Sequence, residues 1–230
     1  MHKIADNLKK VSARIEQAAH TAARETTEIC LLAVSKTRSA GAIRRACDCG
    51  QRQFGENYLQ EALEKQTLLT DLDLEWHFIG PIQSNKTRAI AENFDWVHSV
   101  DRVKVARRLS EQRPPARGPL NICLQINTDA EATKAGVDYR DLEALAAQVS
   151  ELPALRLRGL MAIPARRTEP AQQQAVFEQV AAALERLQKR LPQAPLDTLS
   201  MGMSADLEAA IAAGATIVRV GTDIFGPRNP

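Results

Sequence analysis

The chain has 230 residues, of which 44% are hydrophobic and 4% aromatic, and its net charge is +2 from 30 basic and 28 acidic residues. This length suits one α/β barrel with a sizeable core, and the balanced charge offers no electrostatic footprint for nucleic acid. No run of 18 apolar residues predicts a membrane span, and the N-terminus lacks an apolar signal region, so we expect a soluble cytoplasmic protein that binds neither nucleic acid nor membrane.

Strand and helix patterns alternate along the chain after an N-terminal helical stretch from about Ile4 to Arg24. Eight strands are predicted, at Ile29–Ser35, Gln53–Gly55, Glu75–Ile79, Trp96–Val100, Ile122–Asn127, Leu157–Ile163, Thr198–Met201 and Ile217–Val220. The helices predicted between them are Ala40–Cys49, Tyr58–Leu69, Asn85–Glu92, Arg102–Glu111, Leu142–Glu151, Ala171–Arg190 and Ala205–Ala213.

Eight such units predict a single (β/α)₈ TIM barrel that occupies residues 1–230 as one domain. An open doubly wound sheet is the alternative, but it would more often carry a G-x-G-x-x-G fingerprint after its first strand, and this chain has none. In a barrel, the active site lies at the carboxyl ends of the strands, and the loops after strands seven and eight often hold a phosphate.

Lys36 ends the first apolar run, which predicts a lone amine at the carboxyl mouth of a buried strand. Desolvation disfavours the charged form of lysine, and a deprotonated lysine forms Schiff bases with aldehydes. A plain solvated loop lysine is the alternative for Lys36 taken by itself.

The loops after the last two strands have the residue types of a phosphate site. Ser204 is expected to cap the helix after strand seven, where its hydroxyl and the first free amides are able to bind a phosphate. Gly221 and Thr222 offer amides and a hydroxyl after strand eight. An ordinary capped helix is the alternative for the first loop.

Strand alternation places Arg219 on the inner face of the last strand. A buried arginine needs a partner, so the alternatives are an ion pair with an inward carboxylate such as Glu56, or a bound ligand. An arginine beside a heteroaromatic nitrogen keeps that nitrogen unprotonated. An aldehyde with a phosphate and a ring nitrogen would satisfy Lys36, the loops and Arg219 together, and pyridoxal 5′-phosphate (PLP) is such a molecule.

Two other polar residues lie near the predicted strand ends. Asn57 is expected either to bond a ring substituent or to cap the next helix, and His77 is expected to be a hydrogen-bonded core histidine. Cys47 and Cys49 have a spacing that fits neither redox nor zinc sites, so we expect no metal site.

Six ordered segments resemble the YggS/PROSC family of PLP-binding proteins, also called PLP homeostasis proteins, from about Ile4 to Arg228. The segments are Ala33–Thr37, Phe54–Tyr58, Trp76–Gly80, Gly159–Met161, Ser200–Ser204 and Arg219–Thr222. The resemblance implies a barrel like the N-terminal domain of alanine racemase, with PLP as a Schiff base on Lys36 and the ring nitrogen facing Arg219. It also implies that the cofactor-binding residues are Lys36, Asn57, Met161, Ser200, Met201, Ser204, Arg219, Gly221 and Thr222.

Family members are thought to buffer or deliver PLP without robust turnover, so we expect a monomeric PLP homeostasis protein whose partners are PLP and PLP-dependent enzymes as recipients, with no catalytic residue. Alanine racemases take their second acid/base from a further domain, and neither Tyr58 nor Tyr139 is an obvious replacement. A PLP-dependent racemase-like enzyme of low activity is the alternative, and a barrel enzyme for a phosphorylated sugar is a third. Asp223 departs from the alanine common in the family, and we expect it to point outward.

Overall fold

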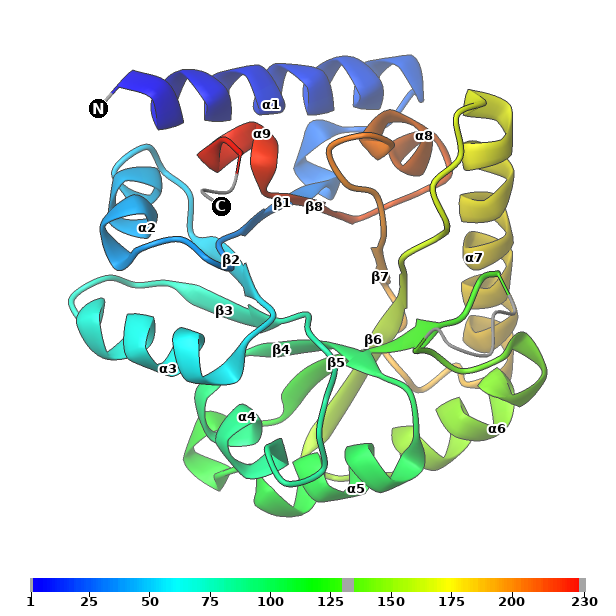
Figure 1. Cartoon of the computed structure of the whole chain (residues 1–230). Coiled ribbons are helices and arrows are strands. Elements are labelled where there is room, and N and C mark those ends of the chain that lie inside the picture. The colour runs from blue at the N-terminus through cyan, green and yellow to red at the C-terminus, as the bar shows by residue number, and fades with distance from the viewer. Residues whose placement is uncertain (1, 130–134, 228–230) are drawn as a thin grey trace.

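Eight parallel strands close into one barrel in the order β1-β2-β3-β4-β5-β6-β7-β8, with β8 paired to β1 (Figure 1). The structure is a computed structural model that describes residues 2–129 and 135–227. The strands are β1 Cys30–Val34, β2 Gln53–Glu56, β3 Glu75–Phe78, β4 Trp96–Val100, β5 Leu120–Ile126, β6 Leu155–Ala162, β7 Thr198–Ser200 and β8 Ile217–Val220. The predicted (β/α)₈ barrel is confirmed.

Helices surround the barrel on its outside (Figure 1). They are α1 His2–Thr21, α2 Ala40–Cys47, α3 Leu59–Leu68, α4 Thr87–Asn93, α5 Val103–Gln112, α6 Tyr139–Ser150, α7 Pro170–Arg190, α8 Leu207–Ala212 and α9 Thr222–Phe225. Two 3₁₀ turns, η1 Thr26–Glu28 and η2 Pro115–Arg117, precede β1 and β5. Helix α6 begins three residues earlier than predicted because the side chain of Asp138 caps it, accepting a bond from the amide of Arg140 at 2.9 Å.

Strand alternation divides the buried side chains into two sets. The main core lies between strands and helices, and fully buried side chains such as Phe54, Ile90 and Leu109 fill it. A small separate cluster of Trp96, Cys123 and Met161 lies inside the barrel. Buried polar side chains, among them His98, Ser200 and Arg219, also lie inside the barrel, and these position the site described below.

Helix α1 runs along α8 and α9, outside the strands β8 and β1 (Figure 1). Its apolar positions Leu8, Val11 and Ile15 are buried, as the sequence periodicity predicts. The first helix of the chain is thereby brought against the loops that follow the last two strands. Among residues 2–129 and 135–227, no helix is long and apolar enough to cross a membrane, and no three His, Cys, Asp or Glu side chains are grouped to hold a metal ion.

Candidate functional site

A cavity of about 280 Å³ opens at the carboxyl ends of the strands. Its size is close to the lower end of the range for small-molecule sites, roughly 300–1,000 Å³. The residues that line it are Val34, Lys36, Asn57, Ile79, Ile163, Met203, Ser204, Ala205, Arg219, Gly221 and Thr222. Segments far apart in the chain therefore meet at the mouth where a barrel is expected to bind its ligand.

Six of the nine predicted site residues line this cavity: Lys36, Asn57, Ser204, Arg219, Gly221 and Thr222. The apolar lining was not predicted and consists of Val34, Ile79, Ile163, Met203 and Ala205. Ile79 lies one residue after β3, and Ile163 lies one residue after β6. Extending the inward and outward alternation of each strand by one residue would have predicted that both side chains point inward.

The other three predicted site residues are not among those that line the cavity. Met161 is buried beside Trp96 and Cys123 inside the barrel. Met201 follows the end of β7 directly and is fully buried in the main core. Ser200 is also fully buried and contacts Arg219. A direct contact of these three side chains with a cofactor stays a prediction.

Lys36 lies in a tight turn immediately after β1. The turn is closed by the amide of Arg38, which donates to the Ser35 carbonyl at 3.0 Å. Thr37 has the left-handed backbone angle φ 62°, unusual for a residue with a branched side chain, and its amide donates to Glu61 Oε1 at 2.6 Å. A carboxylate from α3 therefore holds the strained residue next to Lys36.

A second lysine, Lys65 of α3, is buried beneath this turn. Its Nζ donates to the Ser35 carbonyl at 2.7 Å and to Glu56 Oε1 at 2.6 Å, and it also bonds Glu61. Glu56 is fully buried and accepts a further bond from Ser35 Oγ at 2.6 Å. Burial raises the pKa of Glu56, while Lys65 and Ser35 oppose that rise. The network ties β1, β2 and α3 together under Lys36.

The alternative of an ion pair between Arg219 and Glu56 is wrong, because Glu56 pairs with Lys65 instead. Arg219 Nη1 donates to the carbonyl and the hydroxyl of Ser200 at 2.5 and 2.8 Å, and Nη2 donates to the Ala162 carbonyl at 2.8 Å. Burial lowers the pKa of Arg219 to about 10, so the group remains a cation at neutral pH. A buried positive charge therefore faces the cavity.

The expectation that Ser204 caps the next helix is wrong. Helix α8 begins at Leu207 after Asp206, and Ser204 lies in a turn before it. In that turn, the amide of Met203 donates to Asp206 Oδ1 at 2.6 Å and the amide of Asp206 donates back to the Met203 carbonyl at 3.1 Å. This bonding delays the helix and leaves Ser204 at the cavity rim.

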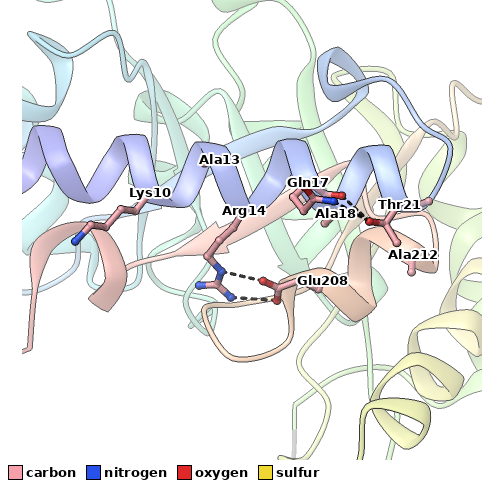
Figure 2. Close-up of a pocket in the computed structure, with 9 residues that line it drawn as sticks. Lys10, Ala13, Arg14, Gln17, Ala18, Thr21, Glu208 and Ala212 are labelled. Carbon is pink, nitrogen blue, oxygen red and sulfur yellow. Dashed lines mark hydrogen bonds and ion pairs between the residues drawn. The ribbon is translucent and has the colours of Figure 1, made fainter.

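Arg14 of α1 connects the two loops at the rim from outside the barrel. Figure 2 shows its guanidinium reaching Glu208 of α8, at 2.8 Å from Oε1. The same group donates to the Ser204 carbonyl at 2.9 Å and to Asp223 Oδ2 at 2.8 Å. Asp223 therefore pairs outside the cavity, which agrees with the expectation that it points outward.

Asn57 contributes a polar atom with no protein partner. Its Oδ1 is buried without a hydrogen bond, although the residue lines the cavity. The backbone of Asn57 is fixed by Gly80, where an added Cβ would lie 2.1 Å from the Asn57 carbonyl oxygen. A buried polar atom of this kind needs a partner, and a ligand in the cavity is able to supply one.

Two histidines lie in the barrel interior below the cavity. His77 bonds Glu75 Oε1 through Nε2 at 2.7 Å and His98 Nε2 through Nδ1 at 2.8 Å, so the expected core histidine is confirmed. Both rings are buried, and that burial lowers the pKa of each, most strongly for His98. Both histidines are therefore neutral at pH 7.

Together, the barrel and the cavity at its carboxyl mouth define a binding protein of the (β/α)₈ class. The family model described as alanine racemase, N-terminal domain, matches residues 4–229. The chain is 59% identical over 229 residues to the pyridoxal phosphate homeostasis protein of Pseudomonas aeruginosa, covering 100% of this chain and 97% of that protein. It is 54% identical over 232 residues to the protein of the same name from Escherichia coli K12, covering 100% and 98%.

Solved structures agree with these relatives. PipY of Synechococcus elongatus PCC7942, solved with PLP bound, has a TM-score of 0.87 at 42% identity. The match covers 97% of this chain and 100% of the PipY chain. Alanine racemase from Corynebacterium glutamicum has a TM-score of 0.71 at 19% identity. This match covers 60% of the racemase chain and shows the fold alone. The chain belongs to the alanine racemase N-terminal domain family, among the pyridoxal phosphate homeostasis proteins.

Replacing Lys65 with Met should destabilise the protein by about 3–5 kcal/mol, because Glu56 would be left as a buried and unpaired charge. Chemical denaturation measures this loss. The matched control is the double variant Lys65→Met/Glu56→Leu, which removes both charges and should recover most of the lost free energy. A double variant no more stable than the single one would assign the loss to packing instead.

The free energy of unfolding should decrease as the pH falls below about 6.5, the ordinary pKa of histidine. Below this pH the unfolded chain binds protons at both histidines. The folded protein does not, because burial lowers the pKa values of His77 and His98. The loss should reach up to about 1.4 kcal/mol per pH unit for each histidine. Urea unfolding between about pH 7.5 and pH 5 measures it.

In the same series, His98→Gln should reduce the pH slope, whereas His20→Gln, which changes an exposed side chain on α1, should leave it unchanged. A slope of wild-type size in His98→Gln would contradict the assignment of this pH dependence to the interior histidines.

Proposed function

We propose that this protein binds PLP as a Schiff base on Lys36 and serves in PLP homeostasis, without robust catalytic turnover. The observation that carries the proposal is the meeting of Lys36, Arg219 and the loops after β7 and β8 around one cavity. The names of the relatives from P. aeruginosa and E. coli support the homeostasis role, and the PLP bound to PipY supports the ligand.

The described cavity residues fit the chemistry of PLP. Arg219 is a cation, and no carboxylate lines the cavity in the described part of the chain, which suits a phosphate dianion. Asp223 is the carboxylate nearest in sequence to the phosphate loop, and Arg14 holds it outside. The unpartnered Oδ1 of Asn57 adds a polar position for a ring substituent.

When bound, PLP supplies an aldehyde, whose carbon bonds to an amine nitrogen while water leaves. Lys36 provides that amine from the turn after β1. Ser204, Gly221 and Thr222 are the rim residues that would hold the phosphate, with hydroxyl groups and main-chain amides. Arg219 would face the ring nitrogen, and its fixed positive charge disfavours a proton on that nitrogen.

A PLP ring without a proton on its nitrogen is a weaker electron sink than a protonated ring. It therefore favours retention of the cofactor over catalytic turnover. Among the described residues that line the cavity, Lys36 is the single one with an amine, and none has a carboxylate, imidazole, thiol or phenol. Neither Tyr58, which is 54% exposed, nor Tyr139 lines the cavity. A racemase-like enzyme of low activity is the alternative function, and a turnover of about one per second or more on L-alanine would favour that alternative.

The proposal extends to delivery of PLP to PLP-dependent enzymes, to a monomeric state and to a cytoplasmic location, as expected from the sequence. Light scattering on the purified protein tests the monomeric state. Transfer of PLP to an apoenzyme, followed by the enzyme's activity, tests delivery.

Purified protein should be yellow, with a visible absorption band from the Schiff base, and Lys36→Ala should lose this band without unfolding. The physical reason is that only the lysine amine forms the covalent bond to the aldehyde. Lys86→Ala, which removes an exposed lysine elsewhere, is the matched control and should keep the band. A colourless wild-type protein that ignores added PLP would contradict the proposal.

Arg14→Ala should weaken PLP binding by about tenfold, the equivalent of one well-made hydrogen bond. The variant frees the Ser204 loop and leaves Asp223 uncompensated beside the phosphate position. Titration with PLP followed by absorbance measures the affinity. Arg44→Ala, which breaks an exposed bidentate pair with Asp71, is the control and should bind like wild type. Equal affinity of Arg14→Ala and wild type would show that α1 does not support the rim.

A further inference from the structure

A continuous chain of hydrogen bonds crosses the barrel interior from the cavity to the opposite face. Arg219 Nη1 lies 2.8 Å from Ser200 Oγ, which lies 2.7 Å from His98 Nδ1. His98 Nε2 lies 2.8 Å from His77 Nδ1, and His77 Nε2 lies 2.7 Å from Glu75 Oε1. The chain therefore links a buried cation at the cavity to a carboxylate at the amino end of β3.

The far end of the chain reaches a cleft at the amino ends of the strands. Glu75 and His77 line this cleft together with Glu28 and Arg158. The side chain of Glu75 is 43% exposed, whereas His77 and His98 are almost fully buried. The carboxylate of Glu75 is therefore the most exposed group in this chain of hydrogen bonds.

The ring of His77 is held rigidly between its hydrogen bonds. Trp96 stacks on it with ring centroids 5.5 Å apart and planes inclined by 4°. The guanidinium of Arg158 lies 4.8 Å from the centre of the Trp96 ring on which it packs. This stacking fixes the plane of the histidine, so its two nitrogens cannot exchange partners by a simple tilt of the ring.

The direction of every hydrogen bond follows from the two ends. The Glu75 carboxylate only accepts, because its bond to His77 lowers its pKa, and His77 Nε2 must therefore carry the proton. A neutral His77 then accepts at Nδ1, so His98 Nε2 must donate. A neutral His98 in turn accepts at Nδ1 from the Ser200 hydroxyl, whose oxygen is left to accept from Arg219.

We propose that Glu75, His77, His98 and Ser200 act as positioning residues for Arg219, with the carboxylate on the far face setting the direction of the whole chain. This inference rests on the proposed function, in which Arg219 faces the ring nitrogen of PLP. In this direction, the hydroxyl hydrogen of Ser200 points away from the guanidinium. A reversed chain would aim the His98 N–H at Ser200 Oγ and leave the hydroxyl hydrogen without that acceptor.

As a consequence, a change at Glu75 is expected to affect the cofactor site at the other end of the barrel. Removing the carboxylate on one face of the barrel should allow the histidines to reverse and should loosen Arg219 on the other face. Ser200 lies next to the guanidinium, so its loss should loosen Arg219 without changing the histidines, whose protons are fixed from the Glu75 end. The two ends of the chain therefore have different expected effects.

Nitrogen-15 NMR on the histidine rings of the full-length protein without PLP tests the chain itself. Wild type, Ser200→Ala and the control Glu28→Leu, which removes another carboxylate of the same cleft, should show His77 and His98 both protonated at Nε2. Glu75→Leu should lose the exclusive protonation at Nε2, with protonation at Nδ1 appearing in both rings. A wild-type ring protonated at Nδ1, or unchanged rings in Glu75→Leu, would overturn the proposal.

PLP titration of the same four proteins tests the effect on the site. Glu75→Leu and Ser200→Ala should bind PLP roughly threefold to tenfold more weakly, as for one weakened hydrogen bond to a charged group, and Glu28→Leu should bind like wild type. Wild-type affinity in a correctly folded Glu75→Leu would overturn the positioning role. If wild type itself fails to bind PLP, the proposed function fails, while the NMR result still decides the direction of the chain. If Glu75→Leu does not fold, the wild-type and Ser200→Ala rings decide it.

Discussion

The burial of one guanidinium, that of Arg219, is the constraint on which the rest of the site depends. A cation inside a small barrel is costly unless polar groups surround it, and here the Ser200 carbonyl and hydroxyl and the Ala162 carbonyl do so. These acceptors come from the ends of neighbouring strands. Because no carboxylate bonds Arg219 directly in the described structure, its charge is not cancelled and remains available to an anionic or electron-rich ligand.

Two further charged networks hold the remaining walls of the cavity in place. Lys65 is buried below the turn that carries Lys36 and joins β1, β2 and α3. Arg14 lies outside the barrel and connects the loop after β7 to the start of α9. The lysine at one wall and the loops at the other are thus fixed from different directions. A site held in this way keeps a bound molecule in one orientation without needing the ligand to order it.

The sequence predicted the barrel and the six residues Lys36, Asn57, Ser204, Arg219, Gly221 and Thr222 at its mouth, because strand alternation and the position of strand ends are local properties of the chain. Alternation also placed Arg219 on the inner face correctly. It failed for the partners: Glu56 belongs to Lys65, and Ser204 is not a helix cap. Pairings between distant segments, such as Arg14 with Asp223, depend on the packing of α1 against α9, which no local pattern encodes.

Reduction of the PLP-loaded protein with borohydride, followed by peptide mapping, tests the central claim most directly. The account predicts one phosphopyridoxyl group on the peptide that contains Lys36, since this is the lysine that lines the cavity in the described structure. A phosphopyridoxyl group on another lysine, with Lys36 unmodified, would contradict the account.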